Sequence, residues 1–451
     1  MKLTNDPSNP AFAASFVPDI AEPPVIEIDG SLAPRAPTRL KETGIDADSL
    51  SNLALKAAYT VPRFTTQWAA QKLCLPLQIV GEILEGLRRH NLLEVLGQSG
   101  PFGFQFAITG RGREHAARLL EISGYVGPAP VSLESYTKHL ELQFDHMPEL
   151  TRDQVQAAIA DLILPDEVAE VAGLAMMSRR SLFLYGPPGN GKTSLSHLLH
   201  NAVRGDLWIP HCLGIDDNII RVFDHECHQA TTAEIPSEMS ARIDQRWVRV
   251  RRPFIVVAGE LTMDSLDLVF SRNLGYYEAP LHFKANGGTF VIDDFGCQRV
   301  EPQQLLNRWI LPLERHVDYL TLQTGQQLEV PFRQMLVVST NLDPEKIMSP
   351  AFLRRMGYRL HLDNPSADRY VEIFRRYAAS RKIPEVPREL TDRLLERYRR
   401  DKRALRSCEP RDLIERAGDI CRFRNQPLTL NAETLDLAWR GYFGNETTED
   451  R

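Results

Sequence analysis

The chain has 451 residues, of which 43% are hydrophobic and 25% are charged, and its formal net charge is −6. This apolar content excludes wholesale disorder, and the length predicts two or three domains. The negative balance argues against binding nucleic acid through bulk electrostatics, although it is compatible with a local basic patch.

Residues 1–45 are rich in proline and have few periodic apolar residues, so we expect a flexible arm. Within it, "VIEIDG" has the alternative of a short edge strand. The first ten residues lack the pattern of a signal peptide, and no apolar run approaches the roughly 20 residues that span a bilayer. Six scattered cysteines form no disulfide framework. We therefore expect a cytoplasmic protein without membrane insertion.

Residues 46–125 change to short amphipathic helices, then two strand patterns around a glycine turn, then one more helix. This succession resembles a small α+β winged-helix domain. Such domains often place the third helix in the major groove of DNA. Here the charges nearly balance, and Glu82 and Glu85 lie on that helix. The segment is therefore compatible with binding DNA or with docking on a protein.

The phosphate-binding motif G-x-x-x-x-G-K-[ST] follows the apolar run "SLFLY" and precedes a helical pattern. In this context backbone N–H groups point at phosphates, the lysine supplies a point charge and the hydroxyl residue faces Mg²⁺. We expect the nucleotide to be held by Gly186, Pro187, Pro188, Gly189, Asn190, Gly191, Lys192, Thr193 and Ser194.

Two acids end the apolar strand pattern "TFVIDDFG" about a hundred residues later. A nucleotide-bound magnesium ion needs a carboxylate nearby, and a second acid can orient the attacking water. Asp293 fits the first role and, with Thr193, is the predicted metal site. Asp294 fits the second, although its side chain is one methylene shorter than the glutamate usual there.

Four further polar residues follow along the chain. Asn341 ends the strand pattern "MLVVSTN", where it would lie near the γ-phosphate; its alternative is a turn before Pro344. Arg354 and Arg355 precede one more strand, and Arg411 begins a helix in "SCEPRDL". Each arginine, taken alone, is compatible with an ordinary surface charge.

In this order the pieces resemble the AAA+ ATPases, over roughly residues 130–445. The resemblance implies an α/β fold: an αβα sandwich over residues 130–364, with a helical lid over residues 365–445. It also implies Mg²⁺-dependent ATP hydrolysis, with Lys192 and Thr193 as the Walker A pair, Asp293 and Asp294 as the Walker B pair and Asn341 as sensor 1. Arg354 or Arg355 resembles the arginine finger, and Arg411 the sensor-2 arginine.

Finer features resemble the MoxR-like and enhancer-binding-activator group, in which a hairpin precedes sensor 1. Residues 317–331 alternate around "TGQQ" as that hairpin would. Residues 207–252 resemble an insertion. Their histidines and cysteines lack the spacing typical of zinc sites, which favours packing roles. Tyr276 and Tyr277 fall where ring ATPases place a substrate loop, or are core aromatics.

An arginine finger acts on the nucleotide of a neighbouring subunit, so the resemblance implies a homo-oligomer, by analogy a hexameric ring. The first functional hypothesis is a chaperone-like remodeller of a client protein. The second is a DNA-binding regulator or loader that acts through the winged helix. A nucleotide switch with little turnover is a third.

Overall fold

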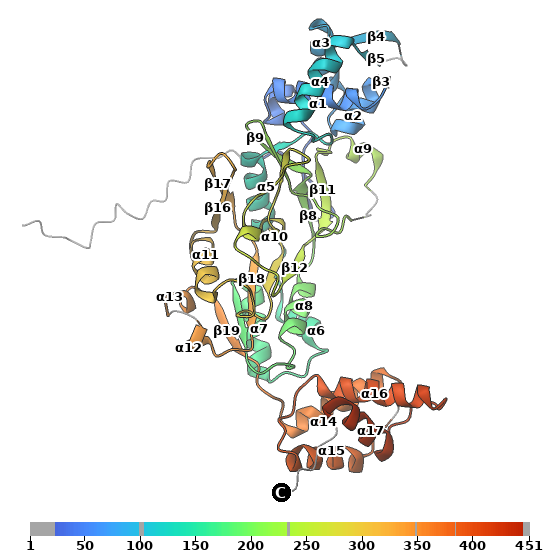
Figure 1. Cartoon of the computed structure of the whole chain (residues 1–451), viewed down its shortest axis with the longest axis vertical. Helices are drawn as coiled ribbons and strands as arrows, with labels where there is room; N and C mark the ends of the chain where they lie inside the picture. The colour runs from blue at the N-terminus through green and yellow to red at the C-terminus, as the bar shows by residue number, and fades with distance from the viewer. Residues whose placement is uncertain (1–22, 99–102, 232–234, 348–349, 384, 445–451) are drawn as a thin grey trace, which may run out of the picture.

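A computed structural model describes residues 23–98, 103–231, 235–347, 350–383 and 385–444. The molecule is elongated, with an amino-terminal module at one end, a β-rich middle module, a parallel sheet with its helices, and a helical unit at the other end (Figure 1). Residues 1–22 of the expected arm and residue 445 of the expected lid lie outside the described residues.

The amino-terminal module packs four helices against a three-stranded antiparallel sheet of order β3-β5-β4. The side chains of Asp46, Thr65 and Thr109 cap three of the helices by accepting a backbone N–H of the first turn. The elements are α1 (Ala47–Tyr59), β3 (Phe64–Thr65), α2 (Thr66–Leu73), α3 (Leu77–Arg89), β4 (Leu93–Gln98), β5 (Phe104–Ile108) and α4 (Gly110–Ile122).

The expectation of a flexible arm is wrong from residue 23 onward. β1 (Val25–Ile28) and β2 (Ser31–Pro34) form an antiparallel hairpin, followed by the 3-10 helix η2 (Leu40–Thr43). Ile28 and Ala33 are buried in the core of the middle module. The alternation in "VIEI" therefore reflects a half-buried strand, as the alternative interpretation of this stretch had it.

The middle module is built from segments that lie far apart in the sequence. A five-stranded sheet has the order β13-β14-β10-β9-β6, and β8 pairs with β11. The elements are β6 (Val131–Ser132), α5 (Leu133–Asp145), β8 (Asp206–Pro210), β9 (Cys212–Ile215), β10 (Asn218–Arg221), α9 (Ser237–Ser240), β11 (Trp247–Arg251), η3 (Asp264–Leu266), β13 (Val269–Ser271), β14 (Tyr276–Glu278) and α10 (Leu281–Lys284).

The expected insertion, residues 207–252, is therefore an integral part of this module. Its strand β9 pairs with β6, and Tyr136 and Leu140 of α5 share its core. The ATPase core was expected to begin at residue 130, but residues 131–145 belong to the middle module. The parallel-sheet unit therefore begins later in the chain.

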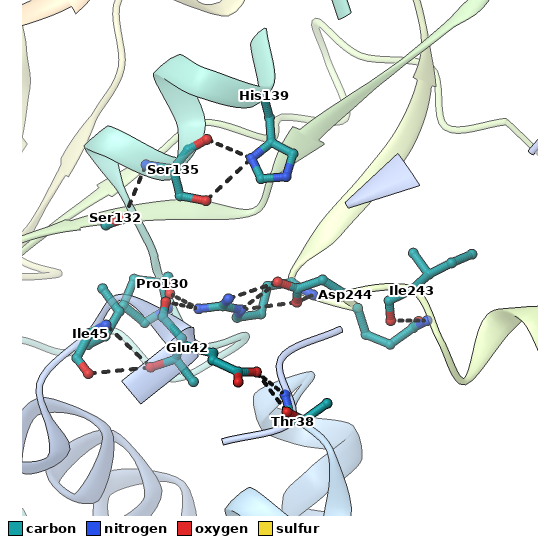
Figure 2. Close-up of polar contacts among 12 residues, drawn as sticks. Thr38, Glu42, Ile45, Pro130, Ser132, Ser135, His139, Ile243 and Asp244 are labelled. Atoms are coloured by element: carbon teal, nitrogen blue, oxygen red, sulfur yellow. Dashed lines mark hydrogen bonds and ion pairs between the residues drawn. The ribbon is translucent and has the colours of Figure 1, made fainter. Parts of the chain in front are cut away.

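A buried ion pair joins three parts of the chain at this module. Arg246 bonds Asp244 at 2.8 Å, and both side chains are 4% exposed. The Arg246 guanidinium also donates to the carbonyls of Thr43 at 2.8 Å and Pro130 at 2.9 Å. Figure 2 shows Pro130 and Asp244 on the two sides of this cluster, with Glu42 and Ile45 nearby. Arg246 therefore ties the end of η2 to Pro130 and to the segment before β11. Because removing one partner of a buried pair leaves a charge uncompensated, loss of either side chain should be strongly destabilising.

The hairpin of β16 (Val317–Thr321) and β17 (Gln327–Pro331) occupies the expected residues. Leu320, Leu328 and Val330 are buried in the middle module, and the backbone N–H of Gln323 donates to the hydroxyl of Tyr277 at 3.0 Å. Tyr277 is buried, and Tyr276 meets Tyr125 edge to face. These tyrosines therefore pack, which supports the core-aromatic alternative for this pair.

The central unit is a three-layered α/β sandwich around an all-parallel sheet of order β12-β15-β18-β7-β19. Alternate residues of β7 face opposite layers: Leu182 and Leu184 pack with α6, α7 and α8, whereas Phe183 packs on the side of α11, α12 and α13. The strands are β7 (Leu182–Tyr185), β12 (Phe254–Val257), β15 (Thr289–Ile292), β18 (Met335–Thr340) and β19 (Tyr358–His361). The helices are α6 (Arg152–Ile159), α7 (Asp166–Met177), α8 (Lys192–Ala202), α11 (Pro302–Arg315), α12 (Pro344–Ile347) and α13 (Pro350–Leu353).

Four helices form the last unit, with a core of its own around Tyr370, Leu394, Leu413 and Trp439. The hydroxyl groups of Tyr370 and Tyr398 are 2.9 Å apart, and Tyr398 donates to buried Glu409 at 2.7 Å. The helices are α14 (Ala367–Ser380), α15 (Arg388–Arg400), α16 (Glu409–Phe423) and α17 (Ala432–Phe443).

Candidate nucleotide site

The glycine-rich loop turns sharply between β7 and α8. Gly186, Gly189 and Gly191 have positive φ angles of 132°, 83° and 86°, which L side chains rarely adopt. A Cβ on Gly186 would also lie 2.2 Å from the carbonyl oxygen of Leu362. The loop therefore holds its shape because glycine occupies these positions, and it leads directly into the amino end of α8.

Lys192 begins α8 and is buried. Its ammonium donates to the carbonyls of Gly186 at 2.9 Å and Pro187 at 3.0 Å, and to Asn341 Oδ1 at 2.6 Å. Burial lowers the pKa of Lys192, and the negative charges of Asp294 and Asp293 oppose that shift. The positive charge is thus placed at the mouth of the loop beside two carboxylates.

The two residues predicted to hold a metal lie together. Thr193 Oγ1 donates to Asp293 Oδ2 at 2.7 Å, and Ser339 Oγ donates to the other oxygen of the same carboxylate. Asp293 follows β15, and Ser339 lies in β18 next to it. A hydroxyl and a carboxylate oxygen are ligands that Mg²⁺ prefers, so this pair fits that ion.

Asp294 and Asn341 end neighbouring parallel strands and meet at the same edge of the sheet. Asn341 Nδ2 donates to Asp294 Oδ1 at 2.9 Å, while its Oδ1 accepts from Lys192. Asp294 has a φ of 47°, a conformation that aspartate tolerates better than most residues. Asn341 therefore bridges the lysine of the loop and the acid predicted to orient water.

The helical unit reaches the loop from the other side. Cys408 N donates to the carbonyl of Gly189 at 2.9 Å, and Ser407 N donates to Asn190 Oδ1 at 3.1 Å. Asn190 Nδ2 in turn donates to Asn364 at 2.9 Å. Arg411 is on the first turn of α16, which begins one residue after Cys408, and its side chain pairs with Asp412 at 3.1 Å. The start of this helix is thus coupled to the loop.

Arg354 and Arg355 lie at the opposite edge of the sheet. They precede β19, and the backbone of Tyr358 bonds Ser181, the residue before β7. Arg355 approaches Glu314 at 3.4 Å. Arg354 is exposed, and its side chain has no partner in the described part of the chain. The structure therefore does not bring these arginines to the loop of their own chain.

The histidines and cysteines of residues 207–252 pack in the middle module. His211, His225 and His228 lie against the ring of Phe223, and Cys212 is buried beside Tyr125. Over the described ranges, no three His, Cys, Asp or Glu side chains are grouped to hold a metal ion.

Two residues at the site, Ser339 and Arg406, were not predicted from the sequence. Ser339 stands two positions before Asn341 in "STN". This pattern indicates that the end of the strand is polar, but it does not indicate that Ser339 bonds Asp293. The side chain of Arg406 lies close to Gly189: a Cβ added to that glycine would be 3.6 Å from it. Asn190 was expected to hold nucleotide, but its bonds to Asn364 and Ser407 depend on contacts far apart in sequence.

The helical unit matches a known family, and the chain is similar to several solved structures. Residues 366–441 match a family described as a domain of unknown function, DUF8689. No curated protein matches the chain. The chain is similar to the RuvB Holliday junction branch migration motor of Thermotoga maritima, at 14% identity over 65% of this chain and 72% of that one, with a TM-score of 0.34. It is also similar to NtrX from Brucella abortus, at 13% identity over 61% of this chain and 57% of that one, with a TM-score of 0.37.

Likenesses at these TM-scores do not show what the chain does. Within the described residues, the helices include none with the length and apolar character that crossing a bilayer requires.

Proposed function

We propose that the protein is an AAA+ ATPase that hydrolyses Mg·ATP in an assembly of identical subunits. The observation that carries this proposal is one hydrogen-bonded cluster, at the carboxyl edge of a parallel sheet, that joins a phosphate loop to two acids and an asparagine. Ligands of open α/β sheets bind at this edge. The fold is likewise proposed as an AAA+ core with a helical lid.

Each residue of the cluster has a separate task. The loop N–H groups and Lys192 bind the β- and γ-phosphates, and Thr193 and Asp293 would hold Mg²⁺, which supplies charge neutralisation between those phosphates when bound. Asp294 accepts a proton from the attacking water. The water oxygen bonds to the γ-phosphorus as the bond to the bridging oxygen breaks, and ADP leaves with the electron pair. Asn341 positions Asp294 and Lys192 relative to each other through its two hydrogen bonds.

The arginine finger must come from another subunit. Arg354 lies at the amino edge and the loop at the carboxyl edge, separated by strands of four and six residues. At about 3.3 Å per residue these strands are about 13 to 20 Å long, beyond the reach of an arginine side chain. We propose Arg354 as the finger, because Arg355 is engaged with Glu314. The subunit number, hexameric by resemblance, stays a prediction.

The assignment of Asp294 is tested by Asp294→Asn. Phosphate release should fall by about 10² to 10⁴-fold, because the proton acceptor is lost, while ATP affinity is retained. The matched control is Asp217→Asn, which changes an exposed acid in the turn before β10. Hydrolysis at the parental rate by Asp294→Asn would refute the role of this carboxylate and with it the proposed reaction geometry.

We further propose that the work is done on a client protein, chosen by a winged-helix module at residues 46–125. On its third helix, Arg88 and Arg89 are paired with Glu85 at 2.8 and 3.3 Å. The hairpin after that helix exposes Val95, Leu96 and Phe104. An exposed apolar hairpin, beside arginines that already share a carboxylate, fits a protein surface better than phosphates.

The alternative, a DNA-binding regulator or loader, is separated by one assay. The ATPase rate is measured with and without duplex DNA at several salt concentrations. Indifference to DNA supports the client-protein proposal. Stimulation that weakens steeply as salt rises would replace it with the DNA alternative. The cytoplasmic location and the MoxR-like grouping stay predictions.

A further inference from the structure

A cavity of about 630 Å³ lies at the amino edge of the parallel sheet. Among its lining residues are Ser181, Gln334 and Gly357, each of which stands directly before a strand of the sheet: β7, β18 and β19. We call it the arginine cavity. The volume is within the range of ligand sites, roughly 300 to 1,000 Å³.

The cavity is strongly cationic. Five arginines line it, and no carboxylate is among its described lining residues. Three of the arginines have other partners: Arg179 donates to the carbonyls of Phe144 and Met147, Arg333 pairs with Glu141 and Arg355 with Glu314. The remaining two are Arg180 and Arg354, which are exposed and lack side-chain partners within the described residues.

A buried amide lies in the same cavity. Gln334 is 8% exposed, and neither its Oε1 nor its Nε2 has a hydrogen-bond partner among the described residues. A buried polar group without a partner costs about 1 to 3 kcal/mol. The amide is therefore complementary to a polar guest, and the guanidinium groups beside it require that guest to be an anion.

We propose that the arginine cavity receives the terminal phosphates of the ATP bound to a neighbouring copy, and that Arg180 is a second catalytic cation there beside Arg354. The inference rests on the proposed function and extends it to a residue outside the motifs of the sequence. The amide of Gln334 donates a hydrogen bond to the same phosphates. Arg180, Arg354 and Gln334 would thus bind the phosphates of a neighbouring copy. The phosphates bound by the chain's own loop lie at the opposite edge of the sheet, out of their reach.

The first test replaces Arg180 by alanine in the full-length protein. Turnover should fall at least tenfold while ATP affinity changes less than twofold, because the loop that binds ATP in that subunit is intact. Arg113→Ala, at an exposed position of α4, is the matched control. A normal rate in Arg180→Ala would overturn the inference. So would loss of assembly with this variant, which would assign the cavity to an acidic segment of the neighbour instead.

The second test mixes two inactive variants. Lys192→Ala lacks a working loop but keeps Arg180, and Arg180→Ala has the reverse defect. In an equal random mixture about a quarter of the interfaces combine the two intact halves, so part of the activity should return. No recovery would show that Arg180 acts within its own subunit and would overturn the inference.

Gln334→Leu separates binding from folding. Because the amide is unpaired, an apolar replacement should leave the melting temperature unchanged or raised, whereas turnover should fall several-fold. Lower stability with normal turnover would contradict its role. Absence of ATP hydrolysis by the parent would remove the proposed function together with this inference, whereas normal variants of a hydrolysing parent would remove the inference alone.

Discussion

The two edges of the parallel sheet differ in whether their polar side chains have hydrogen-bond partners. At the carboxyl edge, Lys192, Thr193 and Asn341 are hydrogen-bonded to other groups of the same site. At the amino edge, Arg180 and Arg354 have no side-chain partners within the described residues, and the amide of Gln334 is buried unpaired. One edge is complete within a single chain, whereas the other is complementary to something the chain does not supply. A reaction that needs both edges needs two copies.

The largest effect should come from breaking the amino edge alone. Arg354→Ala should lower turnover by about 10³ to 10⁵-fold, as expected for an arginine that stabilises charge on a transferring phosphoryl group. ATP affinity, measured by fluorescence with a labelled nucleotide, should be nearly unchanged. Arg355→Ala should have a much smaller effect because that side chain approaches Glu314. The reverse result would move the finger to Arg355.

A smaller effect should come from disturbing the contact between the carboxyl edge and the helical unit. A Cβ on Gly189 would lie 2.7 Å from Cys408 Sγ, so in Gly189→Ala either the Cys408 side chain or the start of α16 must shift. We expect a loss of turnover on the order of 10²-fold from such misplacement.

Gly205→Ala is the matched control for this change. Gly205 has a similar positive φ of 90°, but nothing lies within 4 Å of the added Cβ. Both variants bear the backbone strain, about 1 kcal/mol, and only Gly189→Ala adds a close contact with Cys408. Equal ATPase rates in the two variants would show that the lid contact does not matter for catalysis.

The smallest effect on turnover is expected for the charge at the amino edge, which should act on stability instead. His200 Nδ1 lies 3.0 Å from the hydroxyl of Thr289, the first residue of β15. Burial lowers the pKa of His200 to about 4, against the opposing effect of a hydrogen bond with the backbone of Arg252. The unfolded chain therefore binds more protons between pH 6.5 and pH 4. The free energy of unfolding should fall as the pH drops through this window, by up to about 3 kcal/mol.

His200→Gln keeps a polar side chain but cannot titrate, so its free energy of unfolding should depend less on pH in this window. Denaturant unfolding at a series of pH values measures the difference, with His115→Gln, exposed on α4, as the control. An identical pH dependence in His200→Gln and the parent would contradict the assignment.

The sequence predicts the carboxyl edge well because its chemistry is local. The positive φ angles of the loop demand glycine at fixed spacing, and the polar residues follow directly after buried strands. The parallel arrangement then brings Asp294 and Asn341 together, since strands β15 and β18 are neighbours that end at one edge.

The middle module and the amino edge could not be predicted in the same way. Strand β9 pairs with β6, about eighty residues earlier, and β10 pairs with β14, almost sixty residues later. Strands of two to five residues are too short for their hydrophobic pattern to predict such pairings. The arginine cavity likewise collects residues that precede three separate strands, and nothing local distinguishes Arg180 from a surface charge.

The account depends most on catalysis across two copies. The direct measurement is the specific ATPase activity of the full-length protein over a dilution series, with the mass of the particles followed by light scattering under saturating Mg·ATP. We predict that activity per chain falls steeply as assemblies dissociate into single chains. Single chains that hydrolyse ATP at the full rate would contradict it.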